Sequence, residues 1–448
     1  MKTTTEQKVV TRFAPSPTGF LSLGNYRTAL FNFLYAKQHN GKFILRIEDT
    51  DKERNKKEYE RDIIESFEWL SLPFNEFYRQ SERTDIYKTY LQKLVDEDKA
   101  YISKEEKEGG RSEVIRFRNQ GSTVVFNDII RGEISFDTKE LGDFVIAKSM
   151  EEPVFHFSVV VDDFEMGITH IIRGEDHISN TPRHILIQEA IGAPRPQYAH
   201  LPLILASDRS KLSKRNGAIS IKESRERGYT PEAIINYLAL LGWNPGTEQE
   251  IFSIESLIQQ FSLEKIQKGG AVFNEEKLNW TNKEYIRALP KEKLMNAIEE
   301  RMSKTGKFTG ISRESLILLT PLITERIEKF EDITDMAEKG ELDWFFEEPQ
   351  YIFPESLVWK KGSSRDEAKK HLQALSEILS TLSLEEFTVE KIESIILPYA
   401  DKEGKGNVLW PMRFALSGKE KSPDPFTLAC VLGKEKTLTR LKKAANRL

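Results

Sequence analysis

The first seventy residues alternate between short apolar segments and longer amphipathic ones, and this order limits the fold more than any other feature. Residues 9–13 are strand-like and lead into a loop with two prolines. From Gly24 onward apolar residues recur at helical spacing, residues 43–47 are strand-like again, and residues 53–70 carry a second helical stripe. Strand, loop, helix, strand and helix predict the beginning of a doubly wound α/β sheet.

That order is interrupted further along the chain. Four short strand-like segments separated by turn residues lie at 114–117, 123–126, 133–136 and 144–147. They predict a β-rich insertion, after which strand-like residues 168–172 and 203–205 restore the α/β pattern. Beyond residue 221 the chain is helical, and Thr230 followed by Pro231 is a helix start.

Composition narrows the class of protein. A chain of 448 residues with 39% hydrophobic and 31% charged residues should form two to four domains. It has no signal peptide and no apolar run that could span a bilayer, so we expect a cytoplasmic protein without membrane contact. One cysteine, Cys430, excludes an intramolecular disulfide. A net charge of -5 is not typical of a nonspecific nucleic-acid binder.

Two segments have the chemistry of a phosphate site. Lys211 and Lys214 flank Ser213 on a polar loop that ends at Gly217, where they could place positive charge on a polyphosphate. Taken alone, such a loop is more often simply solvated. Residues 16–25 join the first strand to the first helix, where backbone N–H groups and the helix dipole favour anions.

Three blocks taken together resemble a known family. They are Arg-Phe-Ala-Pro-Ser-Pro-Thr-Gly at 12–19, Ile-Arg-Gly-Glu-Asp-His at 172–177 and Lys-Leu-Ser-Lys-Arg at 211–215. In this order they resemble the glutamate-specific branch of the class I aminoacyl-tRNA synthetases, and the resemblance covers almost the whole chain. It implies a Rossmann-like catalytic domain (1–78 and 160–222), an inserted acceptor-stem-binding subdomain (79–159), a helical stem-contact domain (223–312) and an all-helical anticodon-binding domain (313–448).

The resemblance also implies the reaction and its residues. ATP, with Mg²⁺, would activate L-glutamate as an adenylate, and the glutamyl group would pass to tRNA(Glu), with the protein acting as a monomer. The implied catalytic residues are Ser22, Gly24, Asn25, Lys211 and Lys214. The implied glutamate site is Arg12, Ala14, Ser16, Glu48, Phe155 and Arg173. The implied ATP site is Gly24, Asp176, His177, Leu203, Ile204 and Lys214, and the implied tRNA contacts are Arg413 and Arg440.

The residue types suit these roles. Arg12 and Arg173 lie at the ends of predicted parallel strands, where ligands bind in such sheets, and a guanidinium pairs bidentately with a carboxylate. We expect Arg12 to bind the side-chain carboxylate and Glu48 the ammonium group. Without the resemblance, both arginines would be read as solvent-exposed strand ends.

Two positions depart from the family. Ser22 stands where the family has a histidine that donates to the phosphate, and losing one such donor costs roughly 100- to 1000-fold in rate. We therefore expect slowed activation. Phe155 stands where the family usually has a tyrosine, which forfeits one hydrogen bond of about 0.5 to 1.5 kcal/mol.

These departures leave alternatives open. One is a ligase that charges both tRNA(Glu) and tRNA(Gln) with glutamate. The other is a non-catalytic tRNA-binding paralogue, which Ser22 and Phe155 favour and the intact loop at 211–215 opposes. We expect no zinc site, because Ile102-Ser103-Lys104-Glu105 contains no cysteine where many relatives carry a zinc knuckle.

Overall fold

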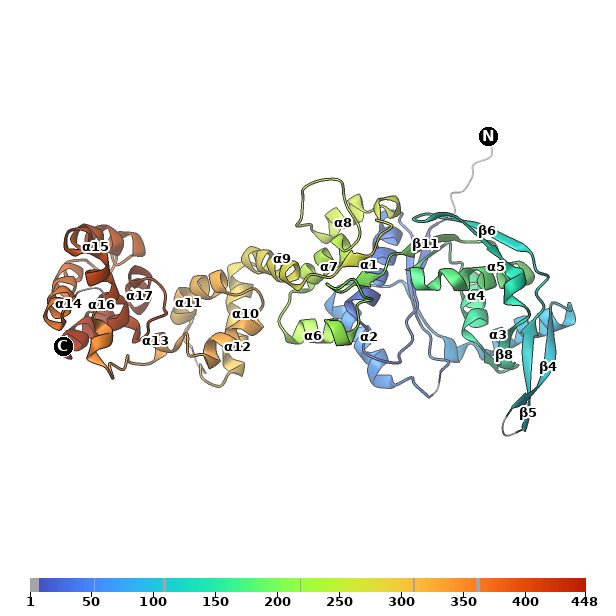
Figure 1. Cartoon of the computed structure of the whole chain (residues 1–448), viewed down its shortest axis with the longest axis horizontal. Helices are drawn as coiled ribbons and strands as arrows, with labels where there is room; N and C mark the ends of the chain where they lie inside the picture. Colours follow the sequence, from blue (N-terminus) through green and yellow to red (C-terminus); the bar gives the residue numbers. More distant parts are fainter. Residues whose placement is uncertain (1–7, 52, 108–109, 218, 309–310, 360–362) are drawn as a thin grey trace. The chain divides into compact units, whose positions relative to one another are not determined.

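The structure is a computed structural model that describes residues 8–51, 53–107, 110–217, 219–308, 311–359 and 363–448. The chain forms two compact units, residues 1–285 and residues 286–448 (Figure 1). No helix among the described residues is long and apolar enough to cross a membrane.

The first unit is built on parallel strands. Strands β1 (Val10–Phe13), β2 (Lys42–Ile47) and β3 (Glu76–Arg79) pair in parallel in the order β1-β2-β3. Strands β10 (His170–Gly174) and β11 (Gln197–Leu201) also pair in parallel. The Thr169 N–H donates to the Val10 carbonyl over 3.0 Å, which sets β10 beside β1. The strands lie side by side in the order β3-β2-β1-β10-β11. The carboxyl ends of β1 and β10 are therefore neighbours at the centre of this row.

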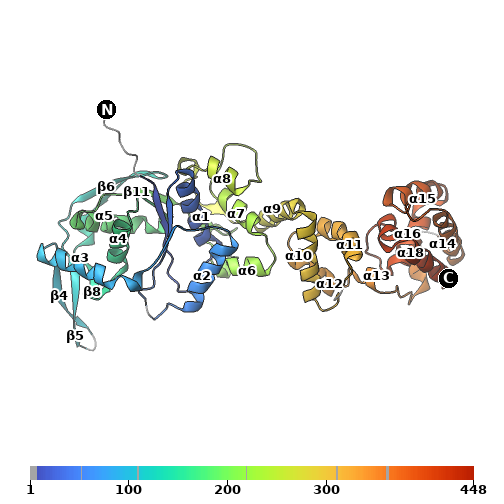
Figure 2. The ribbon, with the colours of Figure 1, turned by 180° about the vertical axis from the view of Figure 1, so that it is seen from behind.

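Helices join these strands, as the apolar spacing predicts. The first unit contains α1 (Leu23–Gln38), α2 (Lys57–Trp69), α3 (Thr84–Asp96), α4 (Phe155–Glu165) and α5 (Thr181–Ile191). Helix α1 links β1 to β2, and Leu30, Phe31 and Leu34 are fully buried in the core beside them. Helices α7 (Pro231–Leu240) and α8 (Ile254–Gln260) pack against α1, as Figure 2 shows from behind. The predicted alternation of parallel strands and helices is therefore present.

The β-rich segment between α3 and α4 contributes to two different sheets. Strands β4 (Ala100–Lys107), β5 (Gly110–Phe117), β8 (Phe144–Ser149) and β9 (Glu152–Pro153) form an antiparallel sheet of their own. Strands β6 (Thr123–Asp128) and β7 (Gly132–Asp137) instead form a hairpin whose β6 joins β11, with Asp128 opposite Tyr198. Part of the predicted insertion thus extends the main sheet.

One predicted strand lies elsewhere. The expected strand at 203–205 is only the two-residue β12 (Ile204–Leu205), which pairs with β13 (Ala271–Val272). The strand that completes the parallel sheet is β11, earlier in the chain. Strand β11 contains the polar residues Gln197 and His200, so its sequence does not have the apolar pattern of a buried strand. His200 is nevertheless fully buried.

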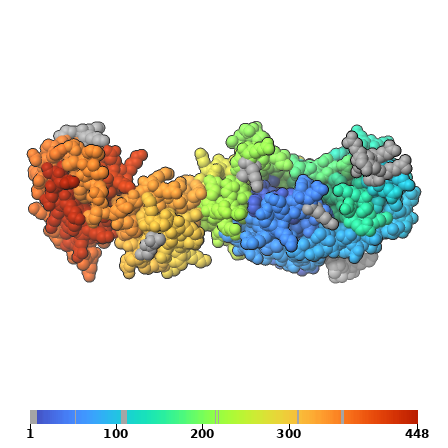
Figure 3. Space-filling view, turned by 90° about the horizontal axis from the view of Figure 1, so that it is seen from below, coloured from blue at the N-terminus to red at the C-terminus, as the bar shows by residue number. Residues whose placement is uncertain are grey.

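Capping side chains stand at the starts of two further helices of the first unit, α6 (Ile221–Glu226) and α7. The Thr230 side chain accepts from the Ala233 N–H at the start of α7, as expected. Helix α6 approaches α2 through Arg225 and Glu65, whose charged atoms are 3.8 Å apart. Figure 3 shows the corresponding light-green surface next to blue surface. Helix α9 (Glu275–Ala288) follows, and one-turn helices lie at Gln80–Glu82, Thr138–Leu141, Glu175–Asn180, Lys214–Asn216 and Leu263–Lys265.

All the secondary-structure elements among the described residues of the second unit are helices. It contains α10 (Lys291–Lys304), α11 (Arg313–Arg326), α12 (Glu331–Glu338), α13 (Asp343–Phe346), α14 (Arg365–Ser380), α15 (Val389–Glu403), α16 (Lys405–Ser417), α17 (Pro425–Leu432) and α18 (Lys434–Ala445), with one-turn helix Pro354–Leu357. These helices share one hydrophobic core of their own.

The two expected tRNA-binding arginines lie in different environments within this unit. Arg440 is only 2% exposed, and its guanidinium donates to the carbonyls of Trp344, Leu416 and Glu347 over 2.6 to 2.8 Å. Arg440 thus satisfies carbonyls at the ends of α13 and α16, and the expected tRNA contact through it stays a prediction. Arg413 is half-buried, donates to the Glu420 carbonyl and lies 4.9 Å from the Trp410 ring centroid.

Candidate active site

A cavity of about 550 Å³ opens at the carboxyl ends of β1, β2, β10 and β11. Most of the site residues expected from the sequence line it: Arg12, Ala14, Ser16, Ser22, Gly24, Asn25, Glu48, Phe155, Arg173, Asp176, His177, Leu203, Ile204 and Lys211. The side chain of Lys214 lies outside the described residues, although its backbone forms a helical turn at Lys214–Asn216. The structure thus gathers three sequence blocks around one cavity.

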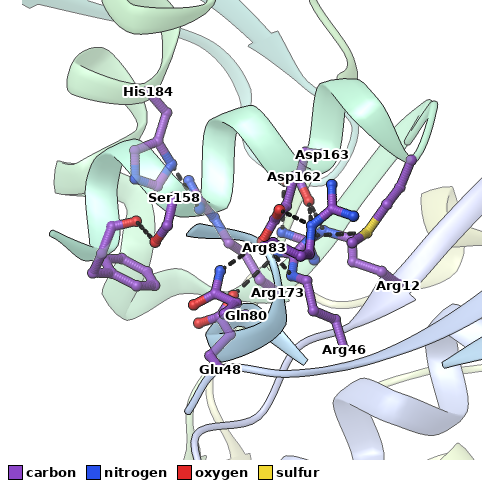
Figure 4. Close-up of polar contacts among 12 residues, drawn as sticks. Arg12, Arg46, Glu48, Gln80, Arg83, Ser158, Asp162, Asp163, Arg173 and His184 are labelled. Atoms are coloured by element: carbon purple, nitrogen blue, oxygen red, sulfur yellow. Dashed lines mark hydrogen bonds and ion pairs between the residues drawn. The ribbon is translucent and has the colours of Figure 1, made fainter. Parts of the chain in front are cut away.

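A buried carboxylate holds Arg12 in place. Asp163 on α4 accepts from the Arg12 Nε–H at 3.1 Å and from the Arg12 Nη2–H at 3.4 Å (Figure 4). The same carboxylate accepts from Arg46 on β2 at 2.8 Å. Burial opposes the ionisation of Asp163, but the two guanidinium groups together hold its pKa below the usual range. Asp163 therefore couples β1 and β2 to α4.

Arg46 also reaches Glu48, which is expected to bind the substrate ammonium group. The Arg46 Nη2–H donates to Glu48 Oε1 over 3.1 Å, and Arg46 is fully buried. Burial raises the pKa of Glu48, and the charge of Arg46 offsets part of that rise. One guanidinium thus sits between Asp163 and Glu48, so the positions of Arg12 and Glu48 depend on a shared partner.

A second carboxylate on α4 extends the buried network away from the cavity. Asp162 is fully buried and accepts from Gln80, Arg83 and Tyr87 over 2.7 to 2.8 Å. These partners come from the one-turn helix after β3 and from α3 and its N-cap. Helix α4 is consequently fixed by charge-assisted bonds on the side that faces the sheet.

Arg173 has different partners. Its guanidinium donates to His200 Nε2 at 3.2 Å, His184 Nδ1 at 3.1 Å, Thr181 Oγ1 at 2.9 Å and the His177 carbonyl at 3.5 Å. Among the described residues no carboxylate lies within ion-pairing distance of it. Burial, followed by the charge of Arg12, lowers the pKa of Arg173 to about 10. Arg173 is thus a buried cation with neutral partners.

The start of helix α1 forms another wall. Ser22 is the N-cap, and both its N–H (3.1 Å) and its hydroxyl (2.9 Å) donate to Asn25 Oδ1. The Leu23 N–H donates to the Ile219 carbonyl, which ties this turn to the chain that leaves the basic loop. Gly24 faces Ile204, and a β-carbon built at Gly24 would lie 3.4 Å from its methyl group. The N-terminus of α1 therefore lines the cavity, with Gly24 close to Ile204.

The basic loop is closed by its own hydrogen bonds. Asn216 Nδ2 donates to Ser210 Oγ at 2.8 Å and to the Lys211 carbonyl at 3.0 Å, and Gly217 has a φ of 102°. Lys211 is exposed and its ammonium group lies 3.3 Å from Asp176. The loop therefore presents Lys211 at the cavity while its ends are held together.

Aromatic and apolar groups complete the lining. The Phe155 ring lies 5.9 Å from His177 and 5.8 Å from His184 between ring centroids. Glu175 accepts from the Leu203 N–H at 2.7 Å and from Arg131 at 2.5 Å. These bonds fix the short segment between β11 and β12 that contains Leu203. Among the described residues, no group of three or more histidine, cysteine, aspartate or glutamate side chains is arranged to hold a metal ion.

Sequence reasoning missed several residues that hold this site together. Arg46 and Asp163 connect the expected substrate residues, and Arg27 donates to the carbonyls of Pro202 and Leu241 beside the cavity. Arg46 lies two positions before Glu48 in the sequence. For Asp163 the only signal was a pair of aspartates within an apolar helix, Val-Val-Val-Asp-Asp, which a soluble protein rarely buries without partners.

Comparison with known proteins agrees with this geometry. The family model for the class I tRNA synthetase (E and Q) catalytic domain matches residues 8–113 and 102–280, and an anticodon binding domain model matches residues 273–445. The chain is 42% identical to a glutamate–tRNA ligase of Aquifex aeolicus, covering 98% of this chain and 99% of that one. It is 40% identical to a glutamate–tRNA ligase of Thermodesulfovibrio yellowstonii, covering 96% of this chain and 98% of that one.

Solved structures agree as well. A crystal structure of a glutamate tRNA ligase from Elizabethkingia meningosepticum in complex with its amino acid has a TM-score of 0.87 at 33% identity, covering 99% of this chain and 100% of that one. A glutamate-tRNA synthetase from Elizabethkingia anophelis has a TM-score of 0.84 at 33% identity, covering 98% of this chain and 100% of that one. The chain belongs to the class I tRNA synthetases, and within them to the glutamate–tRNA ligase family.

Proposed function

We propose that this member of the family activates glutamate with ATP as glutamyl-adenylate and transfers the glutamyl group to tRNA(Glu). The observation that carries this proposal is the single cavity that joins two buried arginines, a buried glutamate and the lysine of a basic loop. Such a site can position a dicarboxylate amino acid beside a polyphosphate, which is most of what the reaction requires.

Each group of the substrate has a candidate partner. Arg12 and Arg173 are the partners of the two carboxylates, with Arg12 assigned to the side chain, and Glu48 is the partner of the ammonium group. Ala14, Ser16 and Phe155 complete the glutamate site. Phe155 has no phenolic hydroxyl to offer the substrate side chain, so selectivity against glutamine would depend on the arginines.

The ATP site is proposed in the same cavity. Its proposed residues are Gly24, Asp176, His177, Leu203 and Ile204, which line the cavity, with Lys214 contributed by the loop. Lys211, Asn25 and Ser22 would act on the phosphates at the start of α1, where helix N–H groups favour anions. Mg²⁺ would enter with ATP, held mainly by phosphate oxygens, as is usual for this ion.

The partners follow from the same proposal. The protein would act in the cytoplasm as a monomer, without zinc, on tRNA(Glu). Residues 79–159 would bind the acceptor stem, residues 223–312 the stem region and residues 313–448 the anticodon. Arg413, which remains partly exposed beside Trp410, is retained as a proposed tRNA contact.

The experiment that tests the function is charging of purified tRNAs with labelled glutamate in the presence of ATP and Mg²⁺. Charging of tRNA(Glu) alone supports the proposal, and charging of tRNA(Glu) and tRNA(Gln) identifies the dual-charging alternative. Binding of tRNA without any charging would reject the catalytic proposal in favour of the non-catalytic paralogue. Omitting ATP is the control, because no adenylate can form without it.

A further inference from the structure

The neutral partners of Arg173 must each be in one defined protonation state. A guanidinium has only donors, so His200 Nε2 and His184 Nδ1 must both present lone pairs to it. His200 is 0% exposed and His184 is 1% exposed. Neither ring can therefore exchange its partner for water.

Asp128 determines which nitrogen of His200 carries the proton. Asp128 Oδ2 lies 2.6 Å from His200 Nδ1, and the carboxylate is 1% exposed. An ionised carboxylate only accepts, so the proton is on Nδ1 and Nε2 keeps its lone pair for the Arg173 Nε–H. Arg173 and His200 are also opposite one another in the parallel register of β10 and β11.

The second histidine continues the same pattern. His184 Nδ1 accepts from Arg173, so its proton is on Nε2, which lies 3.1 Å from His156 Nδ1. All three rings are thus neutral acceptors along a chain that begins at Asp128. This arrangement contrasts with Arg12, whose charge is balanced directly by Asp163.

We propose that Asp128 and His200 are positioning residues that hold Arg173 through an uncharged ring nitrogen, so that its full charge is available to a carboxylate of the substrate. The inference deepens the proposed function and rests on it. A direct carboxylate partner would hold Arg173 equally well but would neutralise it. The His200 imidazole holds the guanidinium in position without neutralising its charge, because the Asp128 carboxylate lies on the other side of the ring.

The contacts of Asp128 make this proposal testable with one amide substitution. Asp128 Oδ1 accepts from the backbone N–H groups of Ile130 at 3.0 Å and Arg131 at 2.9 Å. Asp128 Oδ2 also accepts from the His200 backbone N–H at 3.0 Å. In Asp128→Asn the amide oxygen stays with the two backbone donors of Oδ1 rather than with this single one, so the amide NH₂ faces His200 Nδ1 and the His200 N–H. The ring then carries its proton on Nε2, which meets the Arg173 Nε–H donor to donor.

A double-mutant cycle separates this effect from a general loosening of the fold. In His200→Gln the amide oxygen can accept from Arg173 and has no second ring nitrogen that responds to residue 128. We expect Asp128→Asn to raise the KM for glutamate about tenfold in the His200 background and less than twofold in the His200→Gln background. The two effects differ by at least fivefold, which corresponds to a coupling of about 1 kcal/mol or more. The KM for ATP should stay within twofold in all four proteins.

The controls make each outcome decisive. Tyr198 lies on β11 with His200, and its buried hydroxyl donates to Gln188 of α5. Tyr198→Phe should leave the KM for glutamate unchanged. If Asp128→Asn does not fold, His200→Leu should raise that KM while His200→Gln should not, and equal values would overturn the proposal. Equal effects of Asp128→Asn in both backgrounds would also overturn it. If the wild type charges no tRNA, the proposed function itself fails.

Discussion

At the scale of single residues, Ser22 sets the expected speed of the enzyme. Its hydroxyl lies at the cavity and donates to Asn25 Oδ1, and a serine cannot carry the positive charge of the histidine that the family has at this position. We expect Ser22→His to raise kcat about 100-fold, the lower end of the effect of one oriented donor. Single-turnover charging with saturating glutamate and ATP measures it.

A second N-cap serine provides the control for this substitution. Ser253 begins α8 in the same unit and accepts from the Ser256 N–H, away from the cavity-lining residues. Ser253→His should leave kcat unchanged. An unchanged kcat in Ser22→His as well would mean that the serine is not what limits activation.

His170 makes a prediction about pH and stability. It lies at the start of β10, where it contacts Tyr35 and Thr169, and burial lowers its pKa to about 4. The unfolded chain keeps a histidine pKa of about 6.5, so it binds the proton first as the pH falls. The stability contributed by neutral His170 is therefore complete above about pH 6.5 and is lost as the pH falls toward 4.

His170→Gln should reduce that dependence. We expect the urea midpoint of the wild type to fall between pH 7.5 and pH 5.5, and the midpoint of His170→Gln to fall by less over the same interval. The remaining slope belongs to other buried histidines such as His156, whose pKa is also lowered to about 4 by burial. An identical fall in both proteins would contradict this account of His170.

The candidate site was predictable residue by residue only where a side chain belongs to a sequence block. Arg12, Glu48 and Arg173 each lie in such a block, and all three line the cavity. Asp163 and Asp128 act through contacts with residues that are distant along the chain, at separations of 151 and 72 positions. No rule of sequence spacing connects such pairs. The residues that hold the site residues in position could therefore not be predicted from the sequence.

At the scale of elements, α4 connects the sheet to the substrate site through its two carboxylates. Asp163→Asn would leave Arg12 and Arg46 buried without their shared anion. Removing one partner of a buried ion pair typically costs about 3–5 kcal/mol, so we expect a loss of this size in the free energy of unfolding. Equilibrium denaturation measures it.

The same helix provides the matched control. Glu165 lies near the end of α4 and accepts from Tyr90 at an exposed position. Glu165→Gln should change the free energy of unfolding by less than about 0.5 kcal/mol, as surface substitutions usually do. Equal losses in the two variants would show that the buried ion pairs of Asp163 contribute no more to the free energy of unfolding than a surface hydrogen bond does.

Elements were predictable where burial follows apolar sequence. The strands at 9–13 and 43–47 and the helix that starts at Thr230 occur as β1, β2 and α7. Strand β11 was missed because buried His200 and Tyr198 use their polar groups inside the protein, on Asp128 and Gln188. The pairing of β6 with β11 depends on contacts between distant segments, which local patterns do not report.

At the scale of the whole molecule, the two units should unfold separately. The hydrophobic clusters of residues 13–278 and 44–198 belong to the first unit, and the cluster of residues 286–445 belongs to the second. We therefore expect calorimetry to resolve two transitions.

Arg440 identifies the transition of the second unit. Arg440→Met would leave three buried carbonyls without their donor, at about 1–3 kcal/mol for each group, and should lower one transition only. Arg413→Met, at a half-buried position, should move neither transition appreciably. A shift of both transitions by Arg440→Met would mean that the units unfold as one.

The measurement that tests the central claim most directly is glutamate charging of tRNA(Glu) by the wild type and by Arg173→Met. We predict ATP-dependent charging by the wild type. The variant should lose roughly 100-fold in kcat/KM for glutamate, as expected when a charged hydrogen-bonding partner of the substrate is removed. Its KM for ATP should be retained. No charging by the wild type, or equal charging by both proteins, would contradict the assignment of this cavity to glutamate activation.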